Sequence, residues 1–257
     1  MGTPLAIRSF EYWLRQYRRT WKATVMTGVL TPVLFLAAMG LGLGHLVARS
    51  HGSVQGVSYL VFLAPGLLAA NSMQTGFNEG TWPVLGSIKW VGTYFAMLAA
   101  PLRVRDVLVG HALWVTLRLA SVSAIFLAVM ALFGTVRSAE ALLALPAAVL
   151  TGLAFALPLM AYSATVAQEN SFAVIFRFGV VPMFLFSGTF FPVSQLPSVL
   201  RPVADATPLW QGVALCRGLD LGTLTLASAA LHVVYLVVLA LLGLAVASVT
   251  FRRRLAP

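Results

Sequence analysis

Long apolar stretches, separated by short polar breaks, run through the whole chain. Each stretch holds about 20 apolar-rich residues, enough for a helix to cross a hydrocarbon core about 30 Å thick. We therefore predict an all-α integral membrane fold with six transmembrane helices, at about residues 23–47, 59–77, 107–133, 141–167, 172–191 and 223–251. One membrane domain is expected over residues 1–257, with the bundle at 23–251 and a short tail at 252–257.

The segment before the first predicted span has the pattern of an amphipathic helix. Aromatic and charged side chains separate onto opposite sides when residues are placed 100° apart around a helix axis. The apolar side holds Phe10, Trp13, Leu14, Tyr17 and Trp21, and the polar side holds Arg8, Glu11, Arg15, Arg18, Arg19 and Lys22. This pattern favours an interface helix at residues 1–22. The alternative is a basic segment that simply precedes the first span, and both interpretations place it in the cytoplasm.

Two further segments interrupt the spans. Residues 78–105 are less hydrophobic, and a short helix is predicted at about Trp90–Ala100, stopped by Pro101. Residues 192–221 are too broken by proline to cross the bilayer and too apolar for a simple loop (Pro192, Pro197, Pro202 and Pro208). We predict a re-entrant helical hairpin there, on the outer side between the fifth and sixth helices.

Glycines in the first predicted span leave two interpretations open. Gly40, Gly42 and Gly44 include the small-residue spacing that lets membrane helices approach closely. In a chain with 21 glycines, the same spacing also arises by chance.

Composition excludes a soluble domain. Hydrophobic residues make up 60% of the chain and charged residues only 9%, whereas a soluble domain has about 25% charged residues. The 17 basic residues outnumber the 7 acidic ones, but many lie beside predicted spans, so a nucleic-acid partner is not expected. Basic residues concentrate on cytoplasmic segments of membrane proteins. Their distribution predicts that both termini are cytoplasmic, in a multi-pass protein of the cell membrane.

Known catalytic motifs are absent from the sequence. The only lysines, Lys22 and Lys89, follow no G-x-x-x-x-G-K-[ST] phosphate loop, so the chain is not expected to hydrolyse ATP by that machinery. Its four histidines lack metal-ligand spacing, and it contains no H-E-x-x-H motif. We expect no catalytic residue, no cofactor and no metal on this chain.

Two features are candidates for the transport path. Arg118 falls near the middle of the third predicted span, where an arginine is costly and faces protein or water. It either anchors an anionic substrate group or forms a structural pair. Four phenylalanines crowd the outer end of the fifth span, where they either gate an exit or pack the hairpin (Phe184, Phe186, Phe190 and Phe191).

Three stretches resemble the membrane subunits of type-2 ABC exporters. The segment Met183–Pro197 reads F-x-S-G-x-x-F-P followed by L-P, and Thr207–Trp210 with Arg217-Gly218 matches positions before that family's last helix. Pro101–Gly110 resembles the stretch that opens its third helix. Within the family, the chain looks most like nodulation-type lipooligosaccharide and antibiotic exporter permeases.

The resemblance implies a permease that dimerises and recruits two cytosolic ATPase subunits, which would carry the ATP and Mg²⁺. The substrate would be a lipid-linked saccharide, a lipid or an amphipathic drug-like molecule. ATPase-coupling residues are then expected in and after the short cytoplasmic helix (Trp90, Tyr94, Phe95, Pro101, Arg103, Arg105 and Asp106). The interface helix is the second contact expected, through Phe10, Trp13, Arg15, Arg18 and Trp21. A secondary transporter or a membrane assembly factor, with no ATPase partner, is the alternative.

Overall fold

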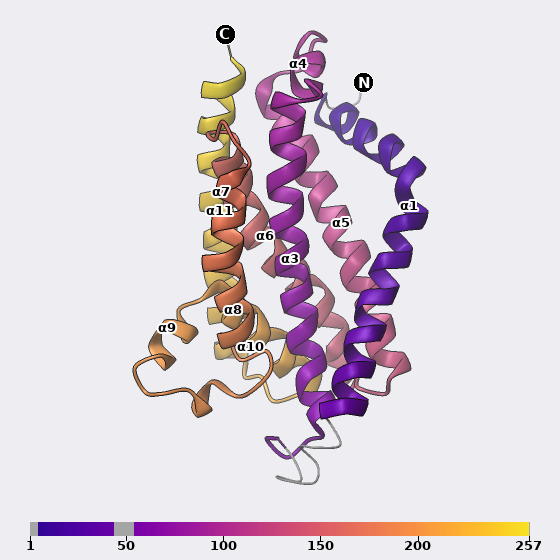
Figure 1. The fold of residues 1–257 in the computed structure, drawn as a ribbon, viewed down its shortest axis with the longest axis vertical. Helices are drawn as coiled ribbons and strands as arrows, with labels where there is room; N and C mark the ends of the chain where they lie inside the picture. Colours follow the sequence, from indigo (N-terminus) through magenta and orange to yellow (C-terminus); the bar gives the residue numbers. More distant parts are fainter. Residues whose placement is uncertain (1–4, 44–53, 257) are drawn as a thin grey trace.

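The computed structural model describes residues 5–43 and 54–256. Within them the regular structure is helical apart from one isolated bridge between Val54 and Val57, and turns and loops join the helices. Long helices run side by side along the longest axis (Figure 1). In chain order the elements are α1 (Leu5–Ala37) with a π-helical continuation (Ala38–Leu43), α3 (Tyr59–Lys89), α4 (Thr93–Leu98), α5 (Val104–Leu132), the 3₁₀ turn η2 (Ala139–Leu143), α6 (Ala144–Ser163), α7 (Asn170–Ile175), a π-helical turn η3 (Phe176–Val180), α8 (Val181–Phe186), the 3₁₀ turn η4 (Val193–Gln195), α9 (Arg201–Asp205), α10 (Pro208–Leu221) and α11 (Leu226–Leu255).

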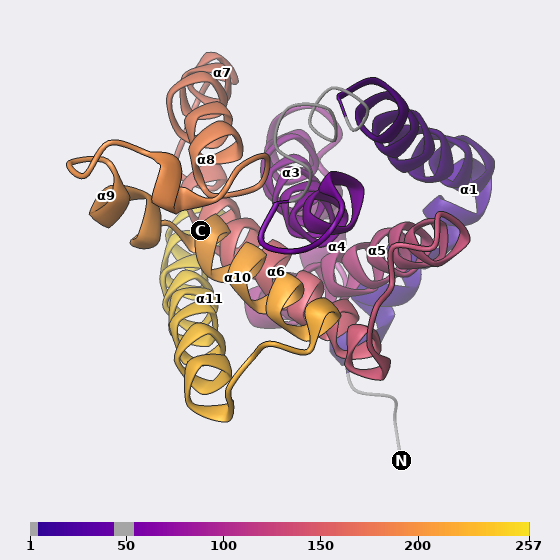
Figure 2. The ribbon, with the colours of Figure 1, turned by 90° about the horizontal axis from the view of Figure 1, so that it is seen from below.

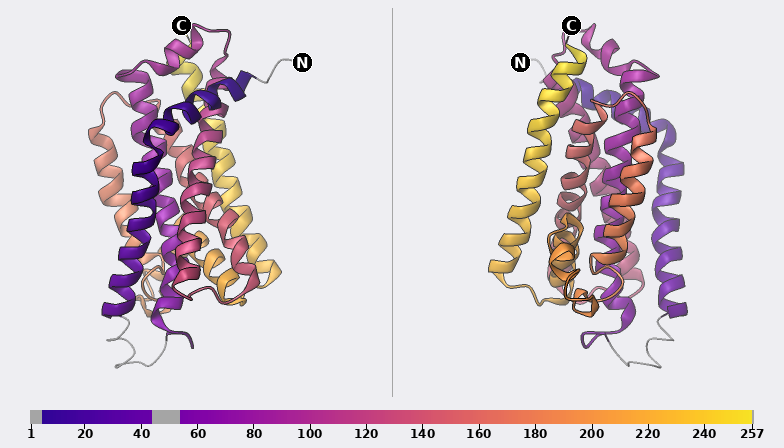
Figure 3. Two further views of the ribbon diagram at one scale, coloured as in Figure 1. Left: turned by 90° about the vertical axis from the view of Figure 1, so that its right-hand side faces the viewer. Right: turned by 60° about the vertical axis from the view of Figure 1, so that its left-hand side comes forward.

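The two ends of the bundle differ. The start of α1, the end of α11 and α4 lie at one end, which we call the terminal end, whereas α9 and α10 lie at the opposite, loop end (Figure 1). The first part of α1 lies across the terminal end before the helix turns to follow the bundle (Figure 3). Seen from the loop end, α10 lies across the bundle (Figure 2), where it packs against α3, α6 and α11.

Helix α6 is the centre of the bundle, with α3, α5, α10 and α11 packed around it. Small residues bring its backbone very close to its neighbours. A Cβ atom on Gly76 of α3 would lie 2.3 Å from the carbonyl oxygen of Gly152, and one on Gly243 of α11 would lie 2.5 Å from the ring of Pro158. Without a hydrophobic driving force between helices in lipid, such close backbone contact supplies the packing energy.

Three predicted boundaries were wrong. The second predicted helix does not end at Phe77, because α3 continues as one helix to Lys89. The fifth ends at Phe186 rather than at residue 191, because Gly188 adopts a positive φ of 77° and the chain turns toward Pro192. The helix expected at Trp90–Ala100 is shorter, since α4 begins only after Gly92, which has φ of 67°.

The prediction of a helical membrane protein is confirmed, whereas the six individual spans stay a prediction. Judged by length and apolar composition, α5, the η2–α6 segment and α11 are long enough to cross a bilayer, among the helices the structure describes. Gly28–Gly40 and Asn170–Phe186 are shorter apolar helices. The predicted interface helix and first span form one continuous helix, α1; residues 1–4 of the first prediction and 44–47 of the second lie outside the described residues. The re-entrant hairpin stays a prediction.

The glycine contacts of α6 lead to a first prediction. Gly76→Ala must push α3 away from α6, because its methyl group would meet backbone rather than a flexible side chain. We expect the free energy of unfolding to fall by about 1–3 kcal/mol, the usual cost of overpacking. Thermal unfolding of the purified protein in detergent measures it.

Gly179→Ala is the matched control, because its Cβ would meet only side-chain atoms at 3.8 Å or more. Equal stability of the two variants would contradict a tight α3–α6 contact.

Candidate functional site

At the terminal end, aromatic side chains join α1, α4, α5 and α11. The Trp13 ring stacks on His111 of α5, with ring centroids 4.3 Å apart. The His111 Nδ1 atom shares a hydrogen bond with the hydroxyl of Tyr94 on α4, whose ring contacts Phe251 of α11 at 5.6 Å. Burial raises the pKa of the Tyr94 phenol, so it remains a neutral hydrogen-bonding group. These buried contacts connect α4 to α5 and, through His111, to α1.

The interface helix packs partly on protein rather than on lipid. Trp13 is buried, and Tyr17 contacts Trp114 of α5 with centroids 5.2 Å apart. Phe10 is half-buried against the same cluster. Arg15, Arg18 and Trp21 are exposed, as the amphipathic pattern predicts for the arginines.

The coupling candidates fall into two groups. Trp90 and Phe95 are 54% and 47% exposed, and Val91 between them is 74% exposed. Tyr94, in contrast, is completely buried, so its side chain can support α4 but cannot touch a partner in this conformation. Pro101 and Arg103 lie in the connection before α5, and both are exposed, as is Arg105 in its first turn. The Asp106 carboxylate accepts a hydrogen bond from the Arg103 amide at 3.0 Å.

Arg118 has a protein partner that the sequence analysis did not identify. Its Nε donates to the Glu79 carboxylate at 3.1 Å, and its guanidinium lies 5.4 Å from the centre of the Tyr17 ring. Both members of the ion pair are mostly buried, with 18% and 16% of their side chains exposed. Glu79 lies within α3, because this helix continues past Phe77. The arrangement favours the structural interpretation of Arg118 over the substrate anchor.

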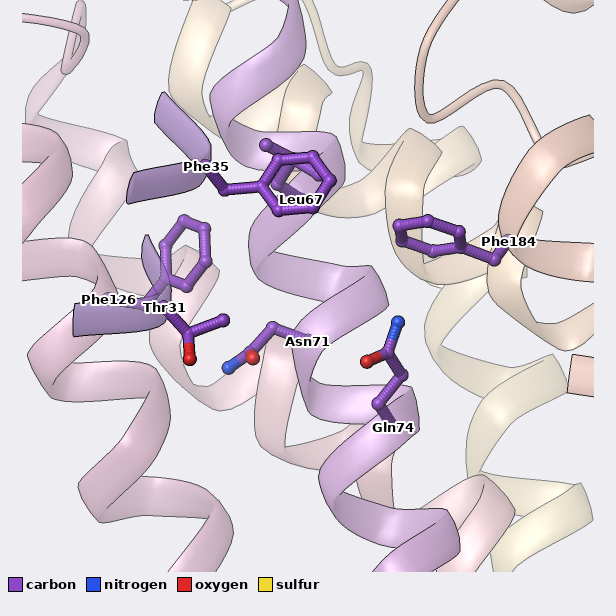
Figure 4. A pocket seen from close by; sticks show the side chains of 7 residues that line it. All are labelled: Thr31, Phe35, Leu67, Asn71, Gln74, Phe126 and Phe184. Carbon is purple, nitrogen blue, oxygen red and sulfur yellow. The ribbon is translucent and has the colours of Figure 1, made fainter. Parts of the chain in front are cut away.

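A small cleft opens beside α3, roughly midway along the bundle. It has a volume of about 50 Å³ and is lined by Thr31, Phe35, Leu67, Asn71, Gln74, Phe126 and Phe184 (Figure 4). These residues come from α1, α3, α5 and α8. Figure 4 shows the Asn71 amide directed toward Thr31 and the Gln74 amide near Phe184. The sequence analysis missed both amides, although amide side chains recur at helical spacing at positions 71, 74 and 78 of α3.

The four candidate gate phenylalanines do not act as one group. Phe184 and Phe190 meet edge to face at 5.0 Å, and Phe35 of α1 lies within 6.4 Å of both. The three rings form a cluster, in which Phe35 and Phe184 also line the cleft. Phe186 points instead into a separate apolar hollow lined also by Leu200 and Val203. Phe191 takes part in no ring contact with the residues of 5–43 and 54–256.

Arg217 ties the loop end together. Its guanidinium donates to the backbone oxygens of Phe62 at 3.0 Å, Gly188 at 2.8 Å and Thr189 at 3.3 Å, and it lies 3.8 Å from the centre of the Phe62 ring. It thus attaches α10 to α3 and to the chain that follows α8. The exporter resemblance singled out this arginine; the three carbonyl acceptors became visible only in the structure.

The Arg118–Glu79 pair gives a second prediction. Arg118→Met leaves a buried carboxylate without its partner, and removing one member of a buried pair costs about 3–5 kcal/mol. We expect a lower unfolding temperature and a smaller yield of folded protein.

The double variant Arg118→Met/Glu79→Gln removes both charges and should recover most of that loss. Arg118→Met protein that is as stable as the native chain but inactive in transport would instead establish the substrate anchor.

Comparison with known proteins agrees with this architecture. The family model for the ABC-2 type transporter matches residues 8–221. The chain is 32% identical to Nodulation protein J of Rhizobium leguminosarum bv. viciae over 250 residues, which cover 95% of both chains. It is 29% identical to Nodulation protein J of Rhizobium meliloti (strain 1021) over 252 residues, covering 95% of this chain and 94% of the relative. These matches extend over nearly the whole helical bundle, so the chain belongs to the ABC-2 type transporter family and is the membrane permease subunit of an ABC transporter.

Proposed function

We propose that this chain forms the transmembrane path of an exporter that moves an amphipathic substrate, driven by two copies of a separate cytosolic ATPase. The terminal end faces the cytoplasm in this proposal, because most basic residues outside the helix interiors belong to segments at that end. The chain crosses the membrane six times, through α1, α3, α5, α6, the α7–α8 segment and α11. The α9–α10 region forms the outer hairpin.

The observation that best supports an ATPase partner is the apolar tip formed by Trp90, Val91 and Phe95. These exposed side chains belong to the end of α3 and to α4, at the terminal end of the bundle (Figure 1), where the proposal places water rather than lipid. Large apolar groups exposed to water together mark an interaction surface. Beneath this tip, Tyr94 and His111 connect α4 to α1 and α5. The tip can therefore take up movement from a partner, and the buried residues can pass it into the bundle.

The amphipathic substrate follows from the chemistry of the cleft beside α3. Its walls combine phenylalanine rings with neutral amide and hydroxyl groups, which suits a molecule with both an apolar and a polar part.

A homodimer is proposed because the α7–α8 segment leaves large apolar side chains uncovered, including Phe176, Phe178 and Phe186. A second permease copy would cover part of this surface, and membrane lipid would cover the rest.

The coupling surface gives a third prediction. Phe95→Asp and Trp90→Asp each place a charge on the apolar tip. We expect each substitution to lower ATP-driven transport by the reconstituted complex at least about tenfold, because losing about 1.4 kcal/mol of binding energy weakens an interaction tenfold. The fraction of permease that co-purifies with the ATPase should fall in parallel.

Leu142→Asp is the matched control, since Leu142 is also exposed but lies near the loop end, in η2. Normal transport and normal co-purification in both tip variants would remove α4 as the ATPase contact.

The three-ring cluster gives a fourth prediction. If Phe184 and Phe190 close the outer side of the cleft, replacing both with alanine should raise ion leak through the resting complex in lipid vesicles. The double variant Phe186→Ala/Phe191→Ala removes the same number of rings outside the cluster and should stay ion-tight. An ion-tight, stable Phe184→Ala/Phe190→Ala variant would leave the cluster with a packing role only.

A further inference from the structure

A second cavity, with a volume of about 390 Å³, lies at the loop end. Its lining comes from four segments that are distant in sequence: the turn before α3, the chain after α8, helix α9 and helix α10. Seen from the loop end, α9 lies beside α8 (Figure 2). None of the lining residues belongs to the cleft beside α3 or to the apolar tip. The volume is within the range of about 300–1,000 Å³ that is typical of small-molecule sites.

Charged residues of both signs line this cavity. Arg201 and Asp205 are four residues apart on α9, so their side chains lie on the same side of this short helix. Arg217 lines the cavity from α10. Within residues 5–43 and 54–256, none of these three side chains forms an ion pair. The cavity therefore offers two positive charges and one negative charge to a ligand.

Backbone oxygens hold both guanidinium groups in place. Arg201 donates from Nε to Leu196 at 2.9 Å and from Nη2 to Ser194, while its Nη1 atom donates to no residue that the structure describes. Arg217 is held by the three carbonyl oxygens described above, and burial lowers its pKa to about 10, so it stays charged at neutral pH. A guanidinium that is already fixed loses little conformational freedom when it binds, and its geometry matches a phosphate.

The other side of the cavity suits an ammonium group. Asp205 is half-buried and carries the only carboxylate among the lining residues, and Trp210 adds an aromatic ring, which attracts cations. A purely anionic ligand would contact Arg201 but bring a like charge toward Asp205, which is unfavourable. A zwitterion that joins a phosphate to an ammonium group satisfies both residues.

An apolar hollow adjoins the cavity and indicates where hydrocarbon would lie. Ser187 lines the hollow and the next residue, Gly188, lines the cavity; the same change occurs between Leu200 and Arg201. Rings and aliphatic side chains, including Phe186, form most of the wall of the hollow. This neighbouring apolar surface favours the headgroup of a phospholipid over a soluble phosphate ester.

We propose that Arg201, Asp205 and Trp210 form a binding site for the zwitterionic headgroup of a membrane phospholipid. Arg201 donates to the phosphodiester, Asp205 neutralises the ammonium group, and the fixed charge of Arg217 attracts the phosphate from the cavity wall. The lipid is a resident ligand that links α9 to α10, and it is distinct from the transported molecule. The inference rests on the proposed function only in placing the loop end at the outer membrane surface.

The experiment measures occupancy of the cavity in the purified full-length permease in dodecyl maltoside. The single native cysteine, Cys216, is buried, so Ser194→Cys introduces an exposed thiol in the lining. Its labelling rate by N-ethylmaleimide is followed with dihexanoyl phosphatidylcholine or dihexanoyl phosphatidylglycerol, each below its micellar concentration. Both probes contain the same chains and a phosphodiester, but only phosphatidylcholine carries an ammonium group. Phosphocholine, which lacks the chains, is the third probe.

We expect phosphatidylcholine to slow labelling at least about threefold more than phosphatidylglycerol does, the selectivity of one partly exposed charge contact. Adding Asp205→Asn should abolish this preference, and it keeps the backbone oxygen that accepts a hydrogen bond from Gln211. Arg201→Gln should weaken protection by both lipids, because both present a phosphodiester. Glu140→Gln is the matched control: it removes an exposed carboxylate in η2, outside the cavity.

Equal protection by the two lipids would overturn the preference for a zwitterion, and no protection by either would overturn the site. A preference that survives in both Asp205→Asn and Arg201→Gln would reject the assigned residues. If phosphocholine protects as well as phosphatidylcholine does, the ligand is a soluble molecule and not a lipid. The measurement needs neither ATPase nor transport, so failure of the proposed function would leave the labelling pattern unchanged.

Discussion

The rest of the structure depends on the close backbone contact between α3 and α6. Gly76 and Gly152 let the two helices approach until a single methyl group would collide with a carbonyl oxygen. The hydroxyl of Ser163 adds a 2.8 Å hydrogen bond to the Gly80 carbonyl farther along the same contact. On the other side of α6, Gly243 admits the ring of Pro158. Because lipid tails are as apolar as the side chains, this tight fit is what makes helix association favourable.

The helices packed around this close contact form the centre of the bundle, whereas α1 and the α7–α8 segment lie at its edge. Helices α3, α6, α10 and α11 pack around the glycine contacts. Helix α1 packs mainly against α5, and the α7–α8 segment is joined to α1 by phenylalanine rings at the loop end. The cleft beside α3 lies between α1 and the α7–α8 segment. The buried contacts of Trp13, His111 and Tyr94 connect α4 to α1 and α5, two of the helices that line the cleft.

Two buried arginines show how the chain tolerates cations away from water. Arg118 is neutralised by a carboxylate on α3, whereas Arg217 is satisfied by three backbone oxygens and an aromatic face. Each links helices that are distant in sequence. Their isolation in the sequence makes them resemble functional sites, but their contacts are those of structural connections.

The sequence by itself determined the membrane class, the helical architecture and the family, because these depend on the length and apolar composition of segments and on local motifs. The amphipathic start and the short helix before Pro101 were also identified from local patterns, although their boundaries moved, and the gate role of the phenylalanines stays a prediction. It did not reveal which glycines form close backbone contacts: a Cβ on Gly40 would meet only the side chain of Leu60, and one on Gly42 would meet open space, whereas one on Gly76 would collide with backbone. Only the tertiary structure decided four other features: the partner of Arg118, the burial of Tyr94, the cleft at Asn71, and the separation of Phe184 and Phe190 from Phe186. All of these depend on how far apart two helices lie and how they are rotated, and in a chain apolar on nearly every face, periodicity does not specify which side of a helix meets its neighbour.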